Sequence, residues 1–148
     1  MSIRIRQAGM SDSISLARLS AQLGYPVSVQ DLAGNMRIIL CDSEQQLWVA
    51  ELNGRVEGWL HAGIRFTLES APYAEIIGLI VDENHRGKGL GKTLTASALH
   101  WARARGVEKL RLRTNTIRKE AHQFYEKLGF TQTKEQKVYD FIFEDHPL

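Results

Sequence analysis

The stretch that decides the fold is Glu75-Ile-Ile-Gly-Leu-Ile-Val-Asp-Glu-Asn-His-Arg-Gly-Lys-Gly-Leu-Gly-Lys-Thr93. Its first part is an apolar run over 76–81, which predicts a central strand buried on both faces. Gly78 interrupts this run, and a glycine in mid-strand indicates a bulge or a ligand close to the backbone. The second part has glycine at alternate positions over 86–91 and opens a helix. Backbone amides and the helix dipole attract negative charge there, so the stretch predicts a site for a phosphate-bearing cofactor.

Two familiar phosphate-binding motifs are excluded by counting residues. A P-loop requires a glycine five residues before Gly91, and that position is Arg86. The dinucleotide-binding fingerprint requires a glycine three positions after Gly89, and that position is Lys92. An R-G-x-G-x-G turn between strand and helix remains. A glycine-rich loop without a ligand is the alternative, although three alternating glycines have little structural use there unless a ligand approaches.

The remaining chain predicts a single mixed α/β domain over 1–148, because strand and helix periodicities alternate without a repeat or a linker. Asn53-Gly54 predicts a tight hairpin, since both residues tolerate positive φ. Ser28 predicts a helix start, because its spacing to Asp31 is that of a capping box. The expected strands are 2–7, 46–52, 55–66, 73–82 and 110–113, with two closing strands over 130–143; the expected helices begin at Ser11 or Asp12 and at Ser28, and span 90–105 and 118–128.

Composition excludes several classes of protein. The chain has 148 residues and a net charge of only +2, whereas a dedicated nucleic-acid binder usually carries a strong basic excess. Cys41 is the only cysteine, which excludes an internal disulfide and a multi-cysteine zinc site and favours a reducing, cytoplasmic compartment. No apolar run approaches the roughly 20 residues of a membrane span, so no membrane partner is expected.

The stretch 75–91, together with Asn115 and the segment Ala121-His-Gln-Phe-Tyr-Glu-Lys-Leu-Gly-Phe130, resembles the GCN5-related N-acetyltransferase (GNAT) superfamily over nearly the whole chain. The resemblance implies a mixed, mostly antiparallel sheet of six to seven strands flanked by about four helices. It also implies a V-shaped splay between the fourth and fifth strands, which admits the pantetheine arm of acetyl-CoA. The implied reaction is N-acetylation of a primary amine, and the segment 115–125 further resembles bacterial members that act on small molecules, including aminoalkylphosphonate acetyltransferases.

The resemblance implies cofactor contacts along the central stretch and the following elements. Lys88 and Lys92 could equally be solvated surface charges, and Asn115 could equally cap the next helix. Arg118 and His122 stand four apart on one helix face and could recognise an anionic group or be solvated. The implied cofactor residues are Leu79, Ile80, Val81, Arg86, Gly87, Lys88, Gly89, Leu90, Gly91, Lys92, Thr93, Asn115, Arg118, His122 and Tyr125.

Three residues are implied in catalysis. The Leu79 amide would polarise the thioester carbonyl where negative charge develops. Glu75 would act as general base, because the acceptor amine has a pKa near ~10 in water and must lose a proton before it attacks. Tyr125 would protonate the departing thiolate. The alternatives are an ordinary strand carboxylate for Glu75, with Glu51, Glu57 and Glu83 as weaker base candidates, and a core aromatic for Tyr125.

Analogy with the family fold assigns the acceptor side to Tyr25, Trp59, Arg65, Tyr73 and Glu75. His61 and His85 have no partner at ligand spacing, so no metal site is expected. The apolar segment 137–143 makes a homodimer plausible. A protein or peptide N-acetyltransferase and a non-catalytic CoA-binding sensor or interaction module remain the alternative functions.

Overall fold

A computed structural model describes residues 2–114 and 119–146. The chain forms two compact units, Met1–Arg113 and Thr114–Leu148. The first unit contains one five-stranded sheet in the order β1-β2-β3-β4-β5, so neighbours in the chain are neighbours in the sheet. Strands β1 to β4 pair with one another in antiparallel fashion, whereas β5 runs parallel to β4. The strands are β1 Ile3–Gln7, β2 Gln45–Leu52, β3 Arg55–Arg65, β4 Tyr73–Val81 and β5 Leu110–Leu112.

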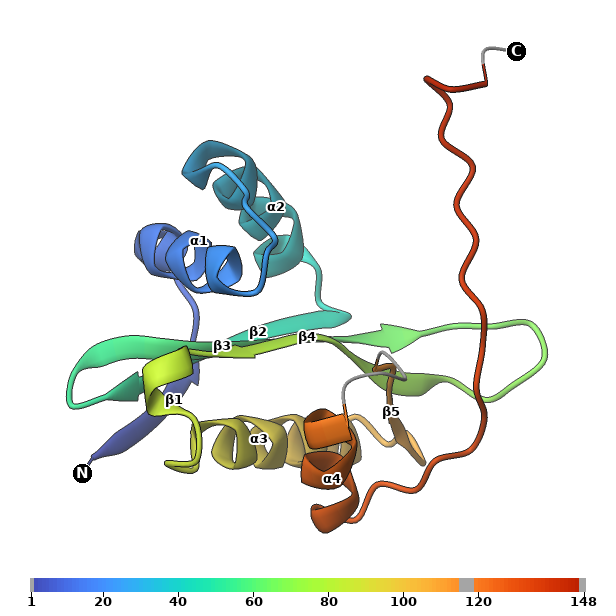
Figure 1. The fold of residues 1–148 in the computed structure, drawn as a ribbon. Helices are drawn as coiled ribbons and strands as arrows, with labels where there is room; N and C mark the ends of the chain where they lie inside the picture. Colours follow the sequence, from blue (N-terminus) through green and yellow to red (C-terminus); the bar gives the residue numbers. More distant parts are fainter. Residues whose placement is uncertain (1, 115–118, 147–148) are drawn as a thin grey trace. The chain divides into compact units, whose positions relative to one another are not determined.

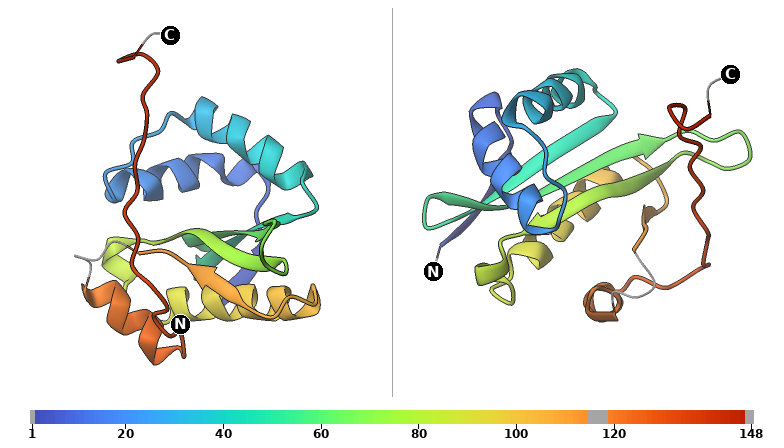
Figure 2. Two further views of the ribbon diagram at one scale, coloured as in Figure 1. Left: turned by 90° about the vertical axis from the view of Figure 1, so that its right-hand side faces the viewer. Right: turned by 45° about the horizontal axis from the view of Figure 1, so that its top comes forward.

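Helices cover both faces of this sheet. The helices α1 (Ser13–Gln22) and α2 (Val29–Cys41) lie on one face and α3 (Leu90–Ala104) lies on the other (Figure 1, and from two further directions in Figure 2). The short 3-10 helices η1 (Met10–Asp12) and η2 (Glu83–His85) precede α1 and α3. The arrangement is a layered α/β fold, and the elements follow the predicted order as far as β5 and the helix after it.

Two of the local sequence predictions are confirmed in detail. The Ser28 hydroxyl accepts a hydrogen bond from the Asp31 amide at 3.0 Å and so caps α2. Asn53 and Gly54 both adopt positive φ, of 52° and 85°, in the turn between β2 and β3. A turn with two residues of positive φ has the same twist as the strands that it joins. The dipeptide Asn-Gly is therefore a strong signal for a hairpin.

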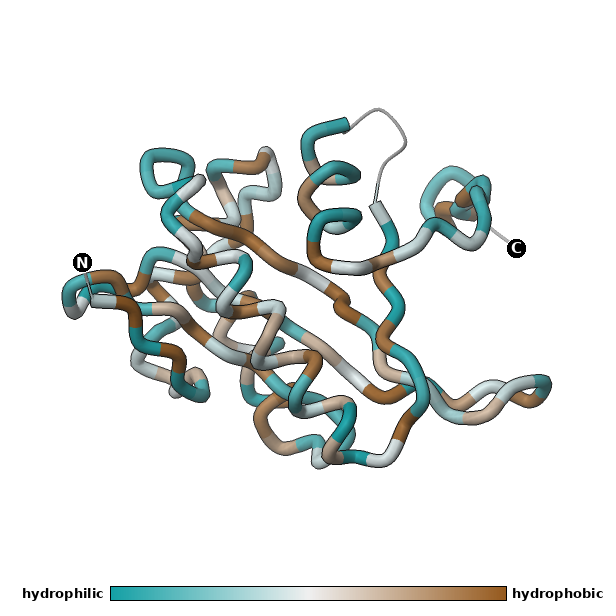
Figure 3. Tube along the Cα trace, turned by 90° about the horizontal axis from the view of Figure 1, so that it is seen from below, coloured by the Kyte–Doolittle hydropathy of each residue, from teal (hydrophilic) through white to brown (hydrophobic). Residues whose placement is uncertain are grey.

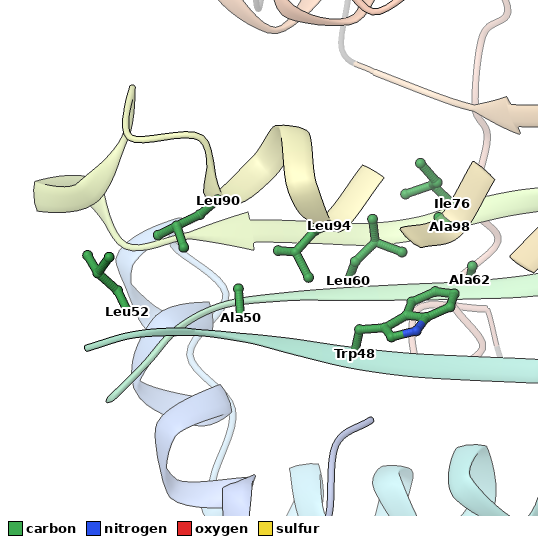
Figure 4. Packing of buried hydrophobic residues seen from close by; sticks show 9 residues of the cluster. All are labelled: Trp48, Ala50, Leu52, Leu60, Ala62, Ile76, Leu90, Leu94 and Ala98. Atoms are coloured by element: carbon green, nitrogen blue, oxygen red, sulfur yellow. The ribbon is translucent and has the colours of Figure 1, made fainter. Parts of the chain in front are cut away.

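The hydrophobic core has one cluster on each face of the sheet. Trp48, Leu60 and Ile76 point from β2, β3 and β4 towards α3, where Leu94 and Ala98 meet them (Figure 4). Burial of a leucine such as Leu94, whose exposed fraction is 0%, stabilises the fold by about 1.5–3 kcal/mol. In Figure 3, seen from the α3 side, hydrophobic segments follow the strands. The second cluster, on the α1 and α2 face, includes Leu16, Leu19, Met36, Val49, Val56 and Ile80.

A β-bulge divides β4 where the mid-strand glycine predicts one. His61 of β3 pairs with Gly78 and Ala62 pairs with Ile76, so Ile77 is the extra residue. The extra residue reverses the alternation of side chains. As a result Ile76 and Leu79, three positions apart, both pack on the α3 side.

The second unit corrects the predicted strand count. Its helix α4 (Lys119–Lys127) agrees with the prediction, but the two strands expected over 130–143 are wrong, because the described residues there form no strand. The sheet therefore has five strands instead of six to seven. Tyr139 and Phe143 are 84% and 72% exposed. Their apolar pattern suits a strand, but a strand also needs a neighbouring backbone to pair with, and local sequence does not supply one.

Across the described residues, none of the helices combines the length and the apolar character needed to cross a membrane.

Candidate functional site

The second half of β4 has a strand neighbour on only one side. β5 pairs with β4 through Ala74, Glu75 and Ile76 only, whereas β3 pairs with β4 up to Val81. Beyond the bulge, the other edge of β4 has no strand partner among the described residues. Along such an edge, every second residue has a backbone N–H and C=O that no neighbouring strand binds. An extended ligand can therefore form hydrogen bonds with these groups.

Gly78 is required by a close approach of Trp59. A Cβ at position 78 would lie 2.9 Å from two atoms of the Trp59 ring, which is shorter than real contacts of this kind. Trp59 is half-buried, packs against the cluster on the α1 and α2 face, and has a buried indole N–H without a partner among the described residues. The ring of Trp59, which was predicted to line the binding site of the acceptor amine, therefore lies directly against the bulge.

The glycine-rich turn joins β4 to α3 as predicted. Gly87 and Gly89 have φ of 81° and 92°, a region that other residues avoid. Gly89 is the N-cap of α3, and both the amide and the hydroxyl of Thr93 donate to its carbonyl, at 3.0 and 2.7 Å. The first three amides of α3, from Leu90 to Lys92, have no acceptor within the helix. No acidic residue lies in this first turn. The arrangement suits an anion, while the individual contacts of Arg86, Lys88 and Lys92 stay predictions.

Asp82 anchors this loop to α1, which the sequence did not reveal. Its carboxylate accepts from Arg18 at 3.0 Å, from Gln22 at 2.9 Å and from the Asn84 amide at 2.9 Å. The side-chain oxygen of Gln22, Oε1, in turn accepts from the Glu83 backbone amide at 3.0 Å. The hydrogen bond from Gln22, supported by the Asn84 amide and Arg18, lowers the pKa of Asp82 to about 2. The loop after β4 is thereby tied to a helix 60 residues earlier in the chain.

Glu57 lies beside this anchor with Asp82 and His85. One possible ligand atom from each of these three residues lies within 4.8 Å of the others, a grouping that the spacing of His85 did not predict. The site already contains cations, because Glu57 pairs with Arg55 at 3.1 Å and with Arg18 at 3.7 Å. His85 Nδ1 also accepts from the Lys88 ammonium at 3.0 Å and so helps to position that side chain of the loop. The predicted lack of a metal stays a prediction.

Glu75 is buried in the first half of β4 and is held by two arginines. Its Oε2 lies 2.8 Å from Arg65 Nη2 and 2.9 Å from Arg65 Nε, and its Oε1 accepts from Arg113 Nε at 3.1 Å. The carboxylate is 7% exposed, while the two arginine side chains are 49% and 52% exposed. Glu75 thus has a residual acceptor position on Oε1 and two fixed cationic neighbours.

Tyr73 and Tyr25 differ in their surroundings, although both were assigned to the acceptor side. Tyr73 is buried, and its ring lies under the Arg111 guanidinium at 4.7 Å and the Lys109 ammonium at 5.1 Å. Tyr25, which follows α1, is 70% exposed. The structure therefore joins Tyr73 to Glu75 and its basic neighbours and leaves Tyr25 on the surface.

The remaining predicted residues belong to the second unit or lie outside the described residues. Asn115 and Arg118 lie outside them. His122 and Tyr125 are on α4, and the Tyr125 ring contacts Phe124 and Phe130 edge-on at 5.1 and 5.7 Å. The roles assigned to these four residues stay predictions.

Comparison with known proteins agrees with this geometry. The model of the acetyltransferase (GNAT) family matches residues 16–130. The chain is 34% identical over 116 residues to the aminoalkylphosphonate N-acetyltransferase of Salmonella typhimurium, a match that covers 78% of this chain and 73% of that protein. It is 32% identical over 91 residues to an uncharacterised N-acetyltransferase of Methanocaldococcus jannaschii, covering 60% of this chain and 40% of the relative.

The fold also matches a solved structure over nearly the whole length of both chains. The aminoglycoside acetyltransferase AAC(6')-Iy, in complex with a bisubstrate analogue of CoA and acetylneamine, superposes with a TM-score of 0.85 at 20% identity, covering 96% of this chain and 99% of that one. At this identity the likeness concerns the fold alone. The chain spans less than half the length of several curated relatives that it matches, including the archaeal protein at 40%.

Proposed function

The chain belongs to the acetyltransferase (GNAT) family, and from this premise we propose that it transfers an acetyl group from acetyl-CoA to a primary amine of a small molecule, in a ternary complex. One observation carries the proposal. The half of β4 that is paired on one side only leads directly into the glycine-rich turn of α3. An extended pantetheine arm suits the open edge, and a pyrophosphate suits the amides of the turn.

The binding residues follow from these two features. Backbone groups of Leu79, Ile80 and Val81 would hold the pantetheine arm along the edge of β4, in the V-shaped opening that the family resemblance implies. The turn and first helical residues from Arg86 to Thr93 would hold the pyrophosphate. Arg86 and Lys92 are exposed and could add charge. Asn115, Arg118 and His122 would add contacts, and the family resemblance supports them.

Each chemical step has a candidate residue. The amine nitrogen attacks the carbonyl carbon, the bond from this carbon to sulfur breaks, and the Leu79 amide stabilises the charge on the carbonyl oxygen. Glu75 takes the proton of the amine, directly or through water, at the position on Oε1 that the arginines leave available. Tyr125 returns a proton to the thiolate, a role that rests on the family resemblance.

A small acceptor is supported by one of the relatives. The aminoalkylphosphonate N-acetyltransferase of Salmonella typhimurium acts, by its name, on a small amine, and the match covers 73% of its length. A cytoplasmic location and a homodimer through 137–143 stay predictions; the exposure of Val138 and Tyr139 supports the second.

An acceptor screen tests the proposal. Release of free CoA thiol from acetyl-CoA is followed with aminoglycosides, polyamines, aminophosphonates and amino acids, and the acetylated product is identified by its mass. We expect turnover with at least one class, and a fall in kcat of about 10- to 1000-fold in Tyr125→Phe if the tyrosine is the acid. Binding of CoA without turnover on any acceptor would contradict the proposal and favour a CoA-binding sensor.

A further inference from the structure

Glu75, Tyr73 and four basic side chains around them form what we term the cationic patch. The basic residues are Arg65, Lys109, Arg111 and Arg113. Arg65 and Arg113 contact Glu75, while Lys109 and Arg111 contact the ring of Tyr73. The residues come from β3, β4, β5 and the positions beside β5. All six belong to the first unit, so the patch is complete within it.

The patch lies on the face of the sheet opposite α3. Ile76, Leu110 and Leu112 pack on the α3 side. Side chains alternate along a strand, so Glu75 and Arg111, their neighbours in the chain, lie on the other face. Trp59, which contacts the bulge position Gly78, packs with the cluster on this same face. The patch and the bulge therefore share one side of β4.

The charge of the patch is unbalanced. It contains four cations and a single carboxylate, although the whole chain carries a net charge of only +2. Glu75 is buried and uses both oxygens to hold two guanidinium groups that are about half exposed. Each guanidinium has five N–H donors, so donors of Arg65 remain after its contacts with Glu75.

Two of the basic side chains in the patch are also held in place by contacts within the protein, without a ligand. The guanidinium carbon of Arg111 lies over the Tyr73 ring, 4.7 Å from its centroid, and this contact restricts the arginine side chain. Ion pairing with Glu75 restricts Arg65 in the same way. Side chains that are ordered in advance lose less entropy on binding, and guanidinium edges match the paired oxygens of carboxylates and phosphonates.

We propose that the acceptor amine carries an oxyanion, a phosphonate, phosphate or carboxylate, that binds the cationic patch; this inference rests on the proposed acetyl transfer. The arginines hold the anionic end of the acceptor, and Glu75, the single carboxylate among them, is available to its ammonium group. Polycationic amines are disfavoured, because they would place like charges beside four cations.

Paired acceptors test the inference. Initial rates are measured with 2-aminoethylphosphonate, with 2-methoxyethylamine as its uncharged counterpart, and with spermidine as a polycation. We expect kcat/KM at least tenfold higher for the phosphonate than for the other two. Arg111→Gln lowers kcat/KM for the phosphonate about 10- to 100-fold, a loss at least tenfold larger than for 2-methoxyethylamine, and Arg111→Lys recovers part of it. Arg103→Gln, an exposed arginine of α3, is the matched control and leaves both rates unchanged.

A binding measurement separates this inference from the proposed reaction. Ethylphosphonate has the anionic group but no amine, and its binding to the CoA-loaded protein is measured by calorimetry in the wild type and in Arg111→Gln. Binding that the variant weakens at least tenfold supports the patch, even if no amine is acetylated and the proposed function fails. Acetylation of 2-methoxyethylamine or spermidine at rates equal to the phosphonate, or the absence of ethylphosphonate binding, overturns the inference while the acetyltransferase function stands.

Discussion

The two halves of β4 differ in what flanks them. From Ala74 to Ile76 the strand lies between β3 and β5, and from Gly78 to Val81 it pairs, among the described residues, with β3 alone. Where both edges are paired, the backbone is occupied and only side chains are available for chemistry, as with Glu75 and its arginines. Where one edge is unpaired, the backbone itself becomes available. One strand thus provides a charged surface and a backbone slot, separated by a single bulge.

A buried carboxylate marks each end of this strand. Glu75 is held by an arginine of β3 and another directly after β5, whereas Asp82, directly after the strand, is held by Arg18 and Gln22 of α1. Asp82 also accepts a backbone amide and so organises a loop, while Glu75 contacts only side chains that are half exposed. We infer that the first end is built for an acceptor and the second for holding the cofactor loop.

Removing the charge of Glu75, at the first end of β4, should have the largest effect on turnover. In Glu75→Gln the proposed general base is lost and the two arginines lose their carboxylate, so kcat/KM should fall by about 100- to 10,000-fold. Stability should change far less, since the arginines can be solvated. CoA release and urea unfolding measure the two quantities. Glu69→Gln, in the exposed loop before β4, is the control. A Glu75→Gln enzyme with turnover within twofold of the wild type would remove Glu75 from the mechanism.

The boundary between the two halves can be tested at Gly78. In Gly78→Ala the new Cβ would lie 2.9 Å from the Trp59 ring, so the ring or the bulge must move. We expect a loss of about 1–3 kcal/mol in the free energy of unfolding and a higher KM for acetyl-CoA. Gly34→Ala, in α2 with nothing within 4 Å, should not destabilise the protein.

A double variant identifies the cause of that loss. Phenylalanine lacks the outer ring atoms of Trp59, so the cost of Gly78→Ala should largely disappear when Trp59→Phe is already present. An equal cost in both backgrounds would mean that the close approach of Trp59 is not the reason for the glycine.

The contribution of Asp82, at the second end of β4, to the free energy of unfolding should depend on pH. The pKa of Asp82 is about 2 in the folded protein and lies near its ordinary value of 3.8 in the unfolded chain. A lowered folded pKa stabilises the protein above the unfolded pKa, and this contribution is lost as the pH falls through about 2. Asp82→Asn should therefore cost at most about 2.5 kcal/mol at pH 7, with the difference from the wild type narrowing between pH 4 and pH 2.

Unfolding by urea at several pH values measures this dependence. Asp31→Asn, an exposed aspartate in the first turn of α2, serves as a control for the loss of one surface charge. A difference between wild type and Asp82→Asn that stays constant from pH 7 to pH 2 would show that the anchor does not depend on ionised Asp82.

Much of the fold was predictable because its signals are local. The capping hydroxyl of Ser28, the positive φ of Asn53 and Gly54 and the bulge beside Gly78 all depend on residues a few positions apart. The two closing strands over 130–143 were wrong for the opposite reason. Their apolar pattern is local, but strand formation depends on a partner that the pattern does not specify.

The features of the site differ in the same way: some depend on neighbouring residues and others on residues far apart in the chain. The sequence by itself determined the strand, the bulge, the glycine turn and the family, because backbone conformation and amide geometry follow from neighbouring residues. Only the tertiary structure decided which charges meet. Glu75 finds Arg65 and Arg113 at separations of 10 and 38 residues, and Asp82 finds Arg18 at 64. Such pairs have no sequence period, since they form only when sheet order and helix packing bring distant side chains together.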